Sequence, residues 1–210
     1  FRSVREHGIC HIQLISNYKH LGGALHHTGD QNNEIQQKAA IGHAAFNRHR
    51  KILYQNHAID ISKRTELFQM LVLSKMMYGA ETWIAMDART MRKFHAVVMR
   101  LYKRLLPPQL ATDHLTDDEV LVQVAQLSPL ELLHRARLRY FVTLVHCRLT
   151  DIWAIFATDE HWTAMLEQAM VWMWEQLQRS SSLPDPRLAY PSWLQLVQQS
   201  PKYWKQIGRA

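Results

Sequence analysis

The sequence LVLSKMMYGAETW, at residues 71–83, decides which fold class is expected for this chain. Together with the residues before it, this stretch repeats apolar side chains at the three- and four-residue spacing of a helix, and Ser62 can cap that helix at its start. The side chains predicted to face a core are Leu67, Phe68, Leu71, Val72 and Met76. We therefore predict an amphipathic helix that packs its apolar face against other helices.

Similar patterns predict further helices on both sides of this segment. One helix is expected from about residue 30 to 55, and another, capped by Asp87, is expected to stop at Pro107. Capping boxes that begin at Thr116 and Ser128 predict two more, and a sixth is expected near residues 159–179. The side chains predicted to be buried over residues 30–106 include Phe46, Leu71, Val72, Tyr78, Trp83, Phe94 and Leu101.

Only residues 1–29 show the alternation and turn residues of β structure. The expected fold is therefore mainly α, with a short N-terminal β-hairpin at 1–29 and a helical bundle at 30–108. A C-terminal helical region should follow at 109–179, and a linker with a short terminal helix at 180–210. The linker begins with SSSLPDP, a composition typical of a connecting segment.

The formal net charge of +7 is concentrated in the first half of the chain. Residues 1–110 contain 16 Lys and Arg against 7 Asp and Glu, whereas residues 111–210 contain 9 against 11. A basic half attracts polyanions such as nucleic acid, although a solvated basic surface without a partner is the alternative. No apolar run reaches the length of a membrane span, so no membrane partner is expected. Two cysteines, Cys10 and Cys147, fit a reducing compartment, and we expect an intracellular protein, nuclear or cytoplasmic.

No residue pattern predicts catalysis by this chain. A polymerase needs an aromatic-x-Asp-Asp turn that holds two divalent cations, and the one Asp-Asp pair, Asp117-Asp118, instead opens a predicted helix. Histidines and a cysteine do gather near the start of the chain, but without the paired spacing of a zinc site. These residues are His7, Cys10, His11, His26 and His27. We therefore predict no catalytic residue and no metal ligand.

Basic residues cluster where the first predicted helix ends and the next begins. Arg48, Arg50 and Lys51 lie within one turn, and Lys63 and Arg64 start the following helix. Such a face can follow a duplex backbone through phosphate contacts, and an ordinary solvated helix face is the alternative. A second basic set, Arg135, Arg137, Arg139 and Arg148, is too dispersed to predict one binding groove. Four tryptophans are interpreted mainly as core residues, with base stacking as the alternative: Trp153, Trp162, Trp172 and Trp174.

Three blocks carry a resemblance to a known family: YKHLGG at residues 18–23, AAFNRHRK at 44–51 and LVLSKMMYGAETW at 71–83. Their order resembles the C-terminal part of reverse transcriptases from non-LTR retrotransposons, and the similarity spans roughly residues 9–148. The resemblance implies that Tyr18, Leu21, Gly22 and Gly23 belong to a primer-grip region. It also implies that residues 30–108 form a thumb-like bundle. The catalytic palm and its Mg²⁺ would then lie before Phe1, so that the chain is a fragment with no cofactor of its own.

Two functions follow as hypotheses. The first is a fragment of an RNA-directed DNA polymerase that clamps the template–primer duplex, with the rest of the reverse transcriptase polyprotein as its other partner. The residues expected to bind nucleic acid are Tyr18, Lys19, Gly22, Gly23, Arg48, Arg50, Lys51, Lys63 and Arg64. The alternative is a non-catalytic helical module, derived from such an element, that binds proteins. An independent metal-dependent enzyme is disfavoured, because no ligand set is visible.

Overall fold

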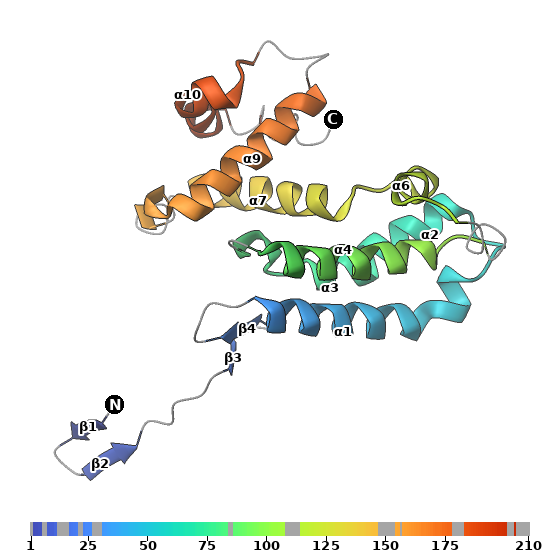
Figure 1. Cartoon of the computed structure of the whole chain (residues 1–210), viewed down its shortest axis with the longest axis horizontal. Coiled ribbons are helices and arrows are strands. Elements are labelled where there is room, and N and C mark those ends of the chain that lie inside the picture. The colour runs from blue at the N-terminus through green and yellow to red at the C-terminus, as the bar shows by residue number, and fades with distance from the viewer. Residues whose placement is uncertain are drawn as a thin grey trace.

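The computed structural model describes residues 31–83, 86–107, 114–146, 154–155, 157–177, 183–200 and 204, and the backbone of four N-terminal strands. The described chain is mainly helical, as predicted from the sequence (Figure 1). Its first half contains α1 (Asn32–His49), η1 (Arg50–Tyr54), α2 (Ile61–Phe68), η2 (Gln69–Leu73), α3 (Ser74–Met76), η3 (Ala80–Thr82) and α4 (Ala88–Lys103). Its second half contains α6 (Asp117–Val124), α7 (Pro129–His146), α9 (Glu160–Leu177) and α10 (Pro186–Gln199).

Four short strands precede the helices. β1 (Arg2–Arg5) pairs antiparallel with β2 (Gly8–His11), and β3 (Asn17–His20) pairs antiparallel with β4 (Gly23–His26). The two pairs are separate sheets, so the single hairpin predicted over residues 1–29 is not shown. β4 contacts α1, which brings the backbone of the β3–β4 pair to the first helix.

Side-chain caps define the starts of α2, α4, α6 and α7. Asp87 accepts a hydrogen bond from the backbone N–H of Thr90 at 2.7 Å, which confirms the predicted start of α4. Thr116 and Glu119 form the predicted capping box at α6, and Ser128 and Glu131 exchange the corresponding two bonds before α7. The predicted cap of α2 is wrong by two residues. Asp60, not Ser62, is the cap, and its carboxylate accepts from the Ser62 N–H at 2.8 Å.

Two π-helical segments interrupt the helices expected to be continuous. η1 follows α1, and η2 separates α2 from α3. The i→i+5 bonding of a π-helix turns the chain less per residue than an α-helix does, so the periodicity used to predict burial slips there. Gly79 then ends this region in the left-handed conformation, with φ of 82°.

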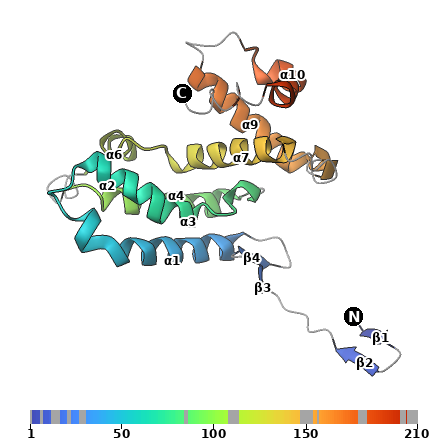
Figure 2. The same cartoon turned by 180° about the vertical axis from the view of Figure 1, so that it is seen from behind.

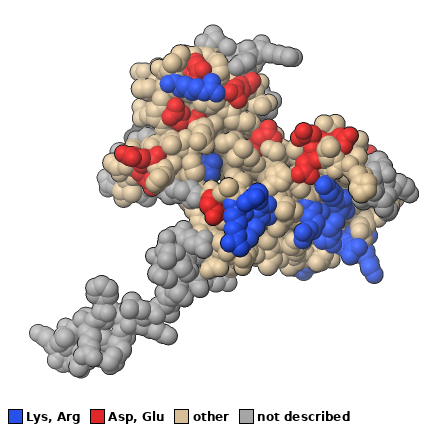
Figure 3. Space-filling view, in the orientation of Figure 1, with Lys and Arg blue, Asp and Glu red and all other residues tan. Residues whose placement is uncertain are grey.

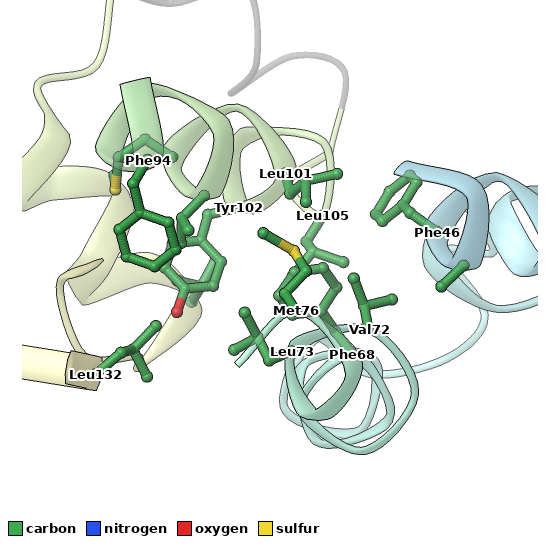
Figure 4. Close-up of a cluster of buried hydrophobic side chains, with 14 of the residues drawn as sticks. Phe46, Phe68, Val72, Leu73, Met76, Phe94, Leu101, Tyr102, Leu105 and Leu132 are labelled. Carbon is green, nitrogen blue, oxygen red and sulfur yellow. The ribbon is translucent and has the colours of Figure 1, made fainter. Parts of the chain in front are cut away.

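Aromatic rings form the centre of the first core (Figure 4). Phe46 is fully buried and stacks on Tyr54 at a centroid distance of 4.7 Å. Phe68 meets the Phe46 ring edge-on at 6.1 Å and the Tyr102 ring at 5.6 Å, so η1, α2 and α4 all close on α1. Full burial of each such side chain contributes roughly 1.5–3 kcal/mol. The same core continues through Val120 and Val124 of α6 to Leu132 and Leu133 at the start of α7.

Five of the seven predicted core residues are buried, namely Phe46, Val72, Trp83, Phe94 and Leu101. The other two predictions are wrong. Leu71 is only partly buried, because it lies in the π-helical η2. Tyr78 is 60% exposed, because it follows the end of α3 in a turn and no longer keeps the helical spacing. The Tyr78 ring lies 5.0 Å from the ammonium group of Lys38.

A second core lies where α7, α9 and α10 meet. Trp162, Leu166 and Met170 of α9 are buried there against Phe141 of α7, and Trp193 of α10 is buried with them. The interpretation of Trp162 as a core residue is therefore confirmed, while Trp172 and Trp174 pack at the edge of the same cluster. Trp153 lies outside the described residues. α7 thus joins the two cores, its first turns in one and its later turns in the other.

None of the helices in the described part of the chain has the length and hydropathy needed to span a membrane.

Candidate nucleic-acid interface

α4 carries a stripe of positive charge along one side, divided into two groups because no Lys or Arg occurs at residues 94–99. Its sequence contains no acidic residue, and its basic residues recur at three-, four- and seven-residue spacings. At about 100° per residue, these side chains share a sector of roughly 120° around the helix axis. We call the set the α4 stripe: Arg89, Arg92, Lys93, Arg100, Lys103 and the adjoining Arg104. Arg89, Arg92 and Arg100 are exposed, and the other three are partly buried.

Two hydrogen bonds join the α4 stripe to α1. Lys93 Nζ donates to Asn32 Oδ1 at 2.7 Å, and Arg104 donates to Asn47 Oδ1 at 2.8 Å. The two bonds are near opposite ends of α1, so the helices run side by side in the same direction (Figures 1 and 2). The polar edge of α1 is therefore held next to the charged edge of α4.

Arg104 is held in place by more than this hydrogen bond. Its guanidinium carbon lies 4.3 Å from the centroid of the Phe46 ring, a cation–π contact that covers the core. Burial lowers the pKa of Arg104, and the positive charge of Arg50 lowers it further. An arginine guanidinium stays charged in proteins, so Arg50 and Arg104 concentrate positive potential where α1 ends.

The positive charges of Arg104 and Arg100 also affect the pKa of His43. Burial, then Arg104, then Arg100 lower its pKa below the ordinary value of 6.5, so the imidazole is neutral at pH 7. A neutral imidazole offers one hydrogen-bond donor and one acceptor. The contacts and charge interactions therefore join five residues, which we call the α1–α4 cluster: His43, Asn47, Arg50, Arg100 and Arg104.

Figure 3 shows these charges on the face of the molecule that carries α4. Lys and Arg gather in two patches there, and Asp or Glu lies beside each of them, most extensively beside the patch towards α6. Among the described residues, no ion pair is formed by Arg50, Arg100 or Arg104. Their charge is thus available to an external anion.

The predicted residues at the end of α1 and the start of η1 are only partly brought together. Arg48, Arg50 and Lys51 are all exposed, as a binding surface requires. Arg50 belongs to the α1–α4 cluster, and its Nε also donates to Gln55 Oε1 at 2.9 Å. Arg48 lies two residues earlier, about 200° around the helix, so it faces away from that cluster.

The prediction for Arg64 is wrong. Arg64 is 4% exposed, and one of its guanidinium nitrogens donates to the carbonyls of Tyr54 at 3.1 Å and Leu105 at 2.8 Å. It joins η1 to the end of α4 and is not available to a ligand. Lys63 is exposed but pairs with Glu66 at 2.7 Å. Neighbours in sequence lie about 100° apart on a helix, so Lys63 and Arg64 do not share one face.

The predicted residues of the β3–β4 pair are described by their backbone alone. Tyr18 lies opposite Leu25 and Lys19 opposite Ala24, and Gly23 begins β4. The side chains of Tyr18 and Lys19 and the whole of Gly22 lie outside the described residues. Their assignment to a binding surface stays a prediction.

One member of the second basic set, Arg137 of α7, has a structural role. Arg137 is 4% exposed, and its guanidinium donates to the carbonyl of Trp83 at 3.2 Å, which ties α7 to η3. Burial lowers the pKa of Arg137 to about 10. Arg139 is exposed, Arg135 is partly buried, and Arg148 lies outside the described residues.

No cluster of three or more His, Cys, Asp or Glu side chains that could hold a metal ion occurs among the described residues. The side chains of His7, Cys10, His11, His26 and His27 lie outside them. Asp117 and Asp118 occupy the first turn of α6, in the capping position that the sequence predicts.

The sequence analysis did not single out the α4 stripe and identified only the basic residues near the end of α1 and the start of α2. The signal was present: 16 residues from Ala88 to Lys103 without an acid, with cations at helical spacing. Comparison with models of known protein families, with curated proteins and with solved structures gives no match.

Proposed function

We propose that this chain is the primer-grip, thumb and following helical region of a non-LTR retrotransposon reverse transcriptase, and that it clamps the template–primer duplex. The α4 stripe is the single observation that carries the proposal, because it is a long cationic surface without neutralising acids on its own helix. The proposal also rests on the order of the three sequence blocks. Its other partner is the remainder of an intracellular polyprotein, including a palm that supplies Mg²⁺.

The length of the stripe suits a nucleic-acid backbone. From Arg89 to Arg104 the helix rises by about 22 Å, at about 1.5 Å per residue. Successive phosphates of one B-DNA strand are about 3.4 Å apart along the axis, so the stripe can follow a run of several phosphates. Phosphate contacts position a duplex without reading its sequence. A clamp that slides along a growing duplex needs this kind of binding.

Two matched double variants test the proposal. Arg92→Gln with Arg100→Gln removes two exposed charges from the stripe, and Arg139→Gln with Lys75→Gln removes two exposed charges from α7 and α3. Titration of a labelled RNA–DNA hybrid at several salt concentrations measures the slope of log K against log salt. The stripe variant should lower that slope by up to about two units, at about 0.9 per phosphate for B-DNA, and should weaken binding to unrelated sequences equally.

The control variant should leave affinity and slope close to those of the wild type. Equal losses from both variants would leave only diffuse charge attraction and would refute the proposed surface. No binding by the wild-type chain at low salt would refute nucleic-acid clamping as a whole.

A protein-interaction module is the second candidate function. Its supporting observation is a set of large apolar side chains that remain exposed: Ile52 at 70%, Met70 at 64%, Val122 at 78% and Leu188 at 89%. Isolated exposed apolar residues are common on soluble proteins, so this observation is the weaker one. Absence of duplex binding at low salt would favour this alternative.

A further inference from the structure

One acidic side chain forms an ion pair with a cation of the α4 stripe. Asp117, at the start of α6, lies with Oδ1 3.0 Å from Lys103 Nζ and with Oδ2 3.7 Å from His95 Nδ1. The second contact is an ion pair only when the imidazole is protonated. Lys103 is the one member of the stripe that an ion pair neutralises among the described residues. α6 and α4 are in contact, which holds the carboxylate there.

We propose that Lys103 and His95 form a phosphate subsite of the duplex-binding surface and that Asp117 closes this subsite in the free protein. The inference rests on the proposed function, since it names a further contact of the same surface. The side chain of Lys103 is 44% exposed and that of Asp117 is 42% exposed, so a ligand can reach both. Ion pairs this exposed are weak, and a phosphate can replace the carboxylate.

The position of Lys103 supports a phosphate contact. It follows Arg100 by three residues and Arg92 by eleven, so the three side chains lie along one edge of α4. A polyanion that follows Arg92 and Arg100 therefore meets Lys103 next. A carboxylate already bound by Lys103 occupies the place of that phosphate, and binding then exchanges one anion for another.

The neighbouring residue provides a matched control. Asp118 also lies in the first turn of α6 and is exposed, and no ion pair involves it in the described part of the chain. Asp117→Asn and Asp118→Asn change the net charge by the same amount. Both also remove one negative charge from the same helix start. A difference between them therefore reports the contact with Lys103 and His95.

The experiment is the titration of a labelled RNA–DNA hybrid with both variants at several salt concentrations. Asp117→Asn should steepen the salt slope by up to about 0.9 and should raise affinity at 0.1 M salt by up to about eightfold, as expected for one further phosphate contact. Asp118→Asn should give a clearly smaller change. Adding Lys103→Gln to Asp117→Asn should abolish the gain. Thermal unfolding followed by circular dichroism verifies that all variants fold.

The two proposals fail differently. If the wild type and both variants bind the hybrid, but Asp117→Asn and Asp118→Asn change affinity and slope equally, then the subsite is refuted and the duplex clamp stands. A gain that persists when Lys103 is replaced also refutes the subsite. If none of the chains binds at low salt, the duplex clamp is refuted, and the subsite with it.

Discussion

Replacing Arg64 by Met should destabilise the fold without acting on ligand binding directly. Arg64 is almost fully buried, and its guanidinium donates to the carbonyls of Tyr54 and Leu105. These carbonyls belong to the end of η1 and to the turn after α4, which are 51 residues apart in sequence. Met keeps most of the aliphatic length but donates no hydrogen bond.

The magnitude follows from the two lost bonds. Hydrogen bonds from a charged group contribute about 1.5–3 kcal/mol each, and a buried carbonyl left unpaired costs about 1–3 kcal/mol. Removing a guanidinium from a buried site recovers part of its desolvation cost. We therefore expect the free energy of unfolding to fall by about 3 kcal/mol.

Urea denaturation followed by circular dichroism measures this change, and Lys63→Met is the matched control. Lys63 is the adjacent residue, is exposed and forms a surface ion pair with Glu66, so its replacement should change stability little. Under conditions where Arg64→Met stays folded, it should bind the RNA–DNA hybrid as the wild type does. Unchanged stability together with lost hybrid binding would show that Arg64 acts at the surface, and would refute the structural role.

Three further outcomes are expected. Gly42→Ala should lower the free energy of unfolding by about 1–3 kcal/mol, because its new Cβ would collide with the buried Met76 side chain. Gly79→Ala should lower it by about 1–2 kcal/mol, because its φ of 82° is unfavourable for alanine. Urea denaturation of both variants measures these losses. Burial lowers the pKa of His134 to about 4, from the usual 6.5. As pH falls from about 6.5 to 4, this imidazole takes up a proton in the unfolded chain but not yet in the folded one. The free energy of unfolding should therefore fall over that range by on the order of 2 kcal/mol. Urea midpoints measured across that range should depend less on pH in His134→Gln than in the wild type. An equal pH dependence in both proteins would refute the assignment of this effect to His134. The chain alone should give no dNTP-dependent primer extension with Mg²⁺, and reproducible extension would contradict this.

The capping residues show how much of the fold was accessible from sequence. Asp87, Thr116 and Ser128 each act within three residues along the chain, so their hydrogen bonds depend on local geometry alone. The apolar stripes were predicted equally well where the helix stays regular, as at Phe46 and Phe94. The same periodicity failed at Leu71, because Leu71 lies in a π-helical turn, where the α-helical spacing no longer holds.

The candidate site was predicted less well than the fold. Sequence proximity placed Arg48, Arg50 and Lys51 together, and all three are exposed, but Arg48 faces away from the α1–α4 cluster. It also placed Arg64 on the surface, where the structure buries it against Tyr54 and Leu105. Whether an arginine near the start of a helix faces solvent or the core depends on which helix packs against it.

The sequence alone therefore determined the helical class, the starts of α4, α6 and α7, most of the first core and the basic character of the first half, because each depends on interactions between close neighbours or on composition. Only the tertiary structure decided which cations share a surface. Arg50 and Arg104 are 54 positions apart, and the packing of α1 on α4 over Phe46 brings their charges together. The contact of Asp117 with Lys103 likewise exists only because α6 folds back onto α4. Which charged side chains of two helices meet depends on the angle and position at which the helices pack. The periodicity of apolar residues along one helix does not specify either.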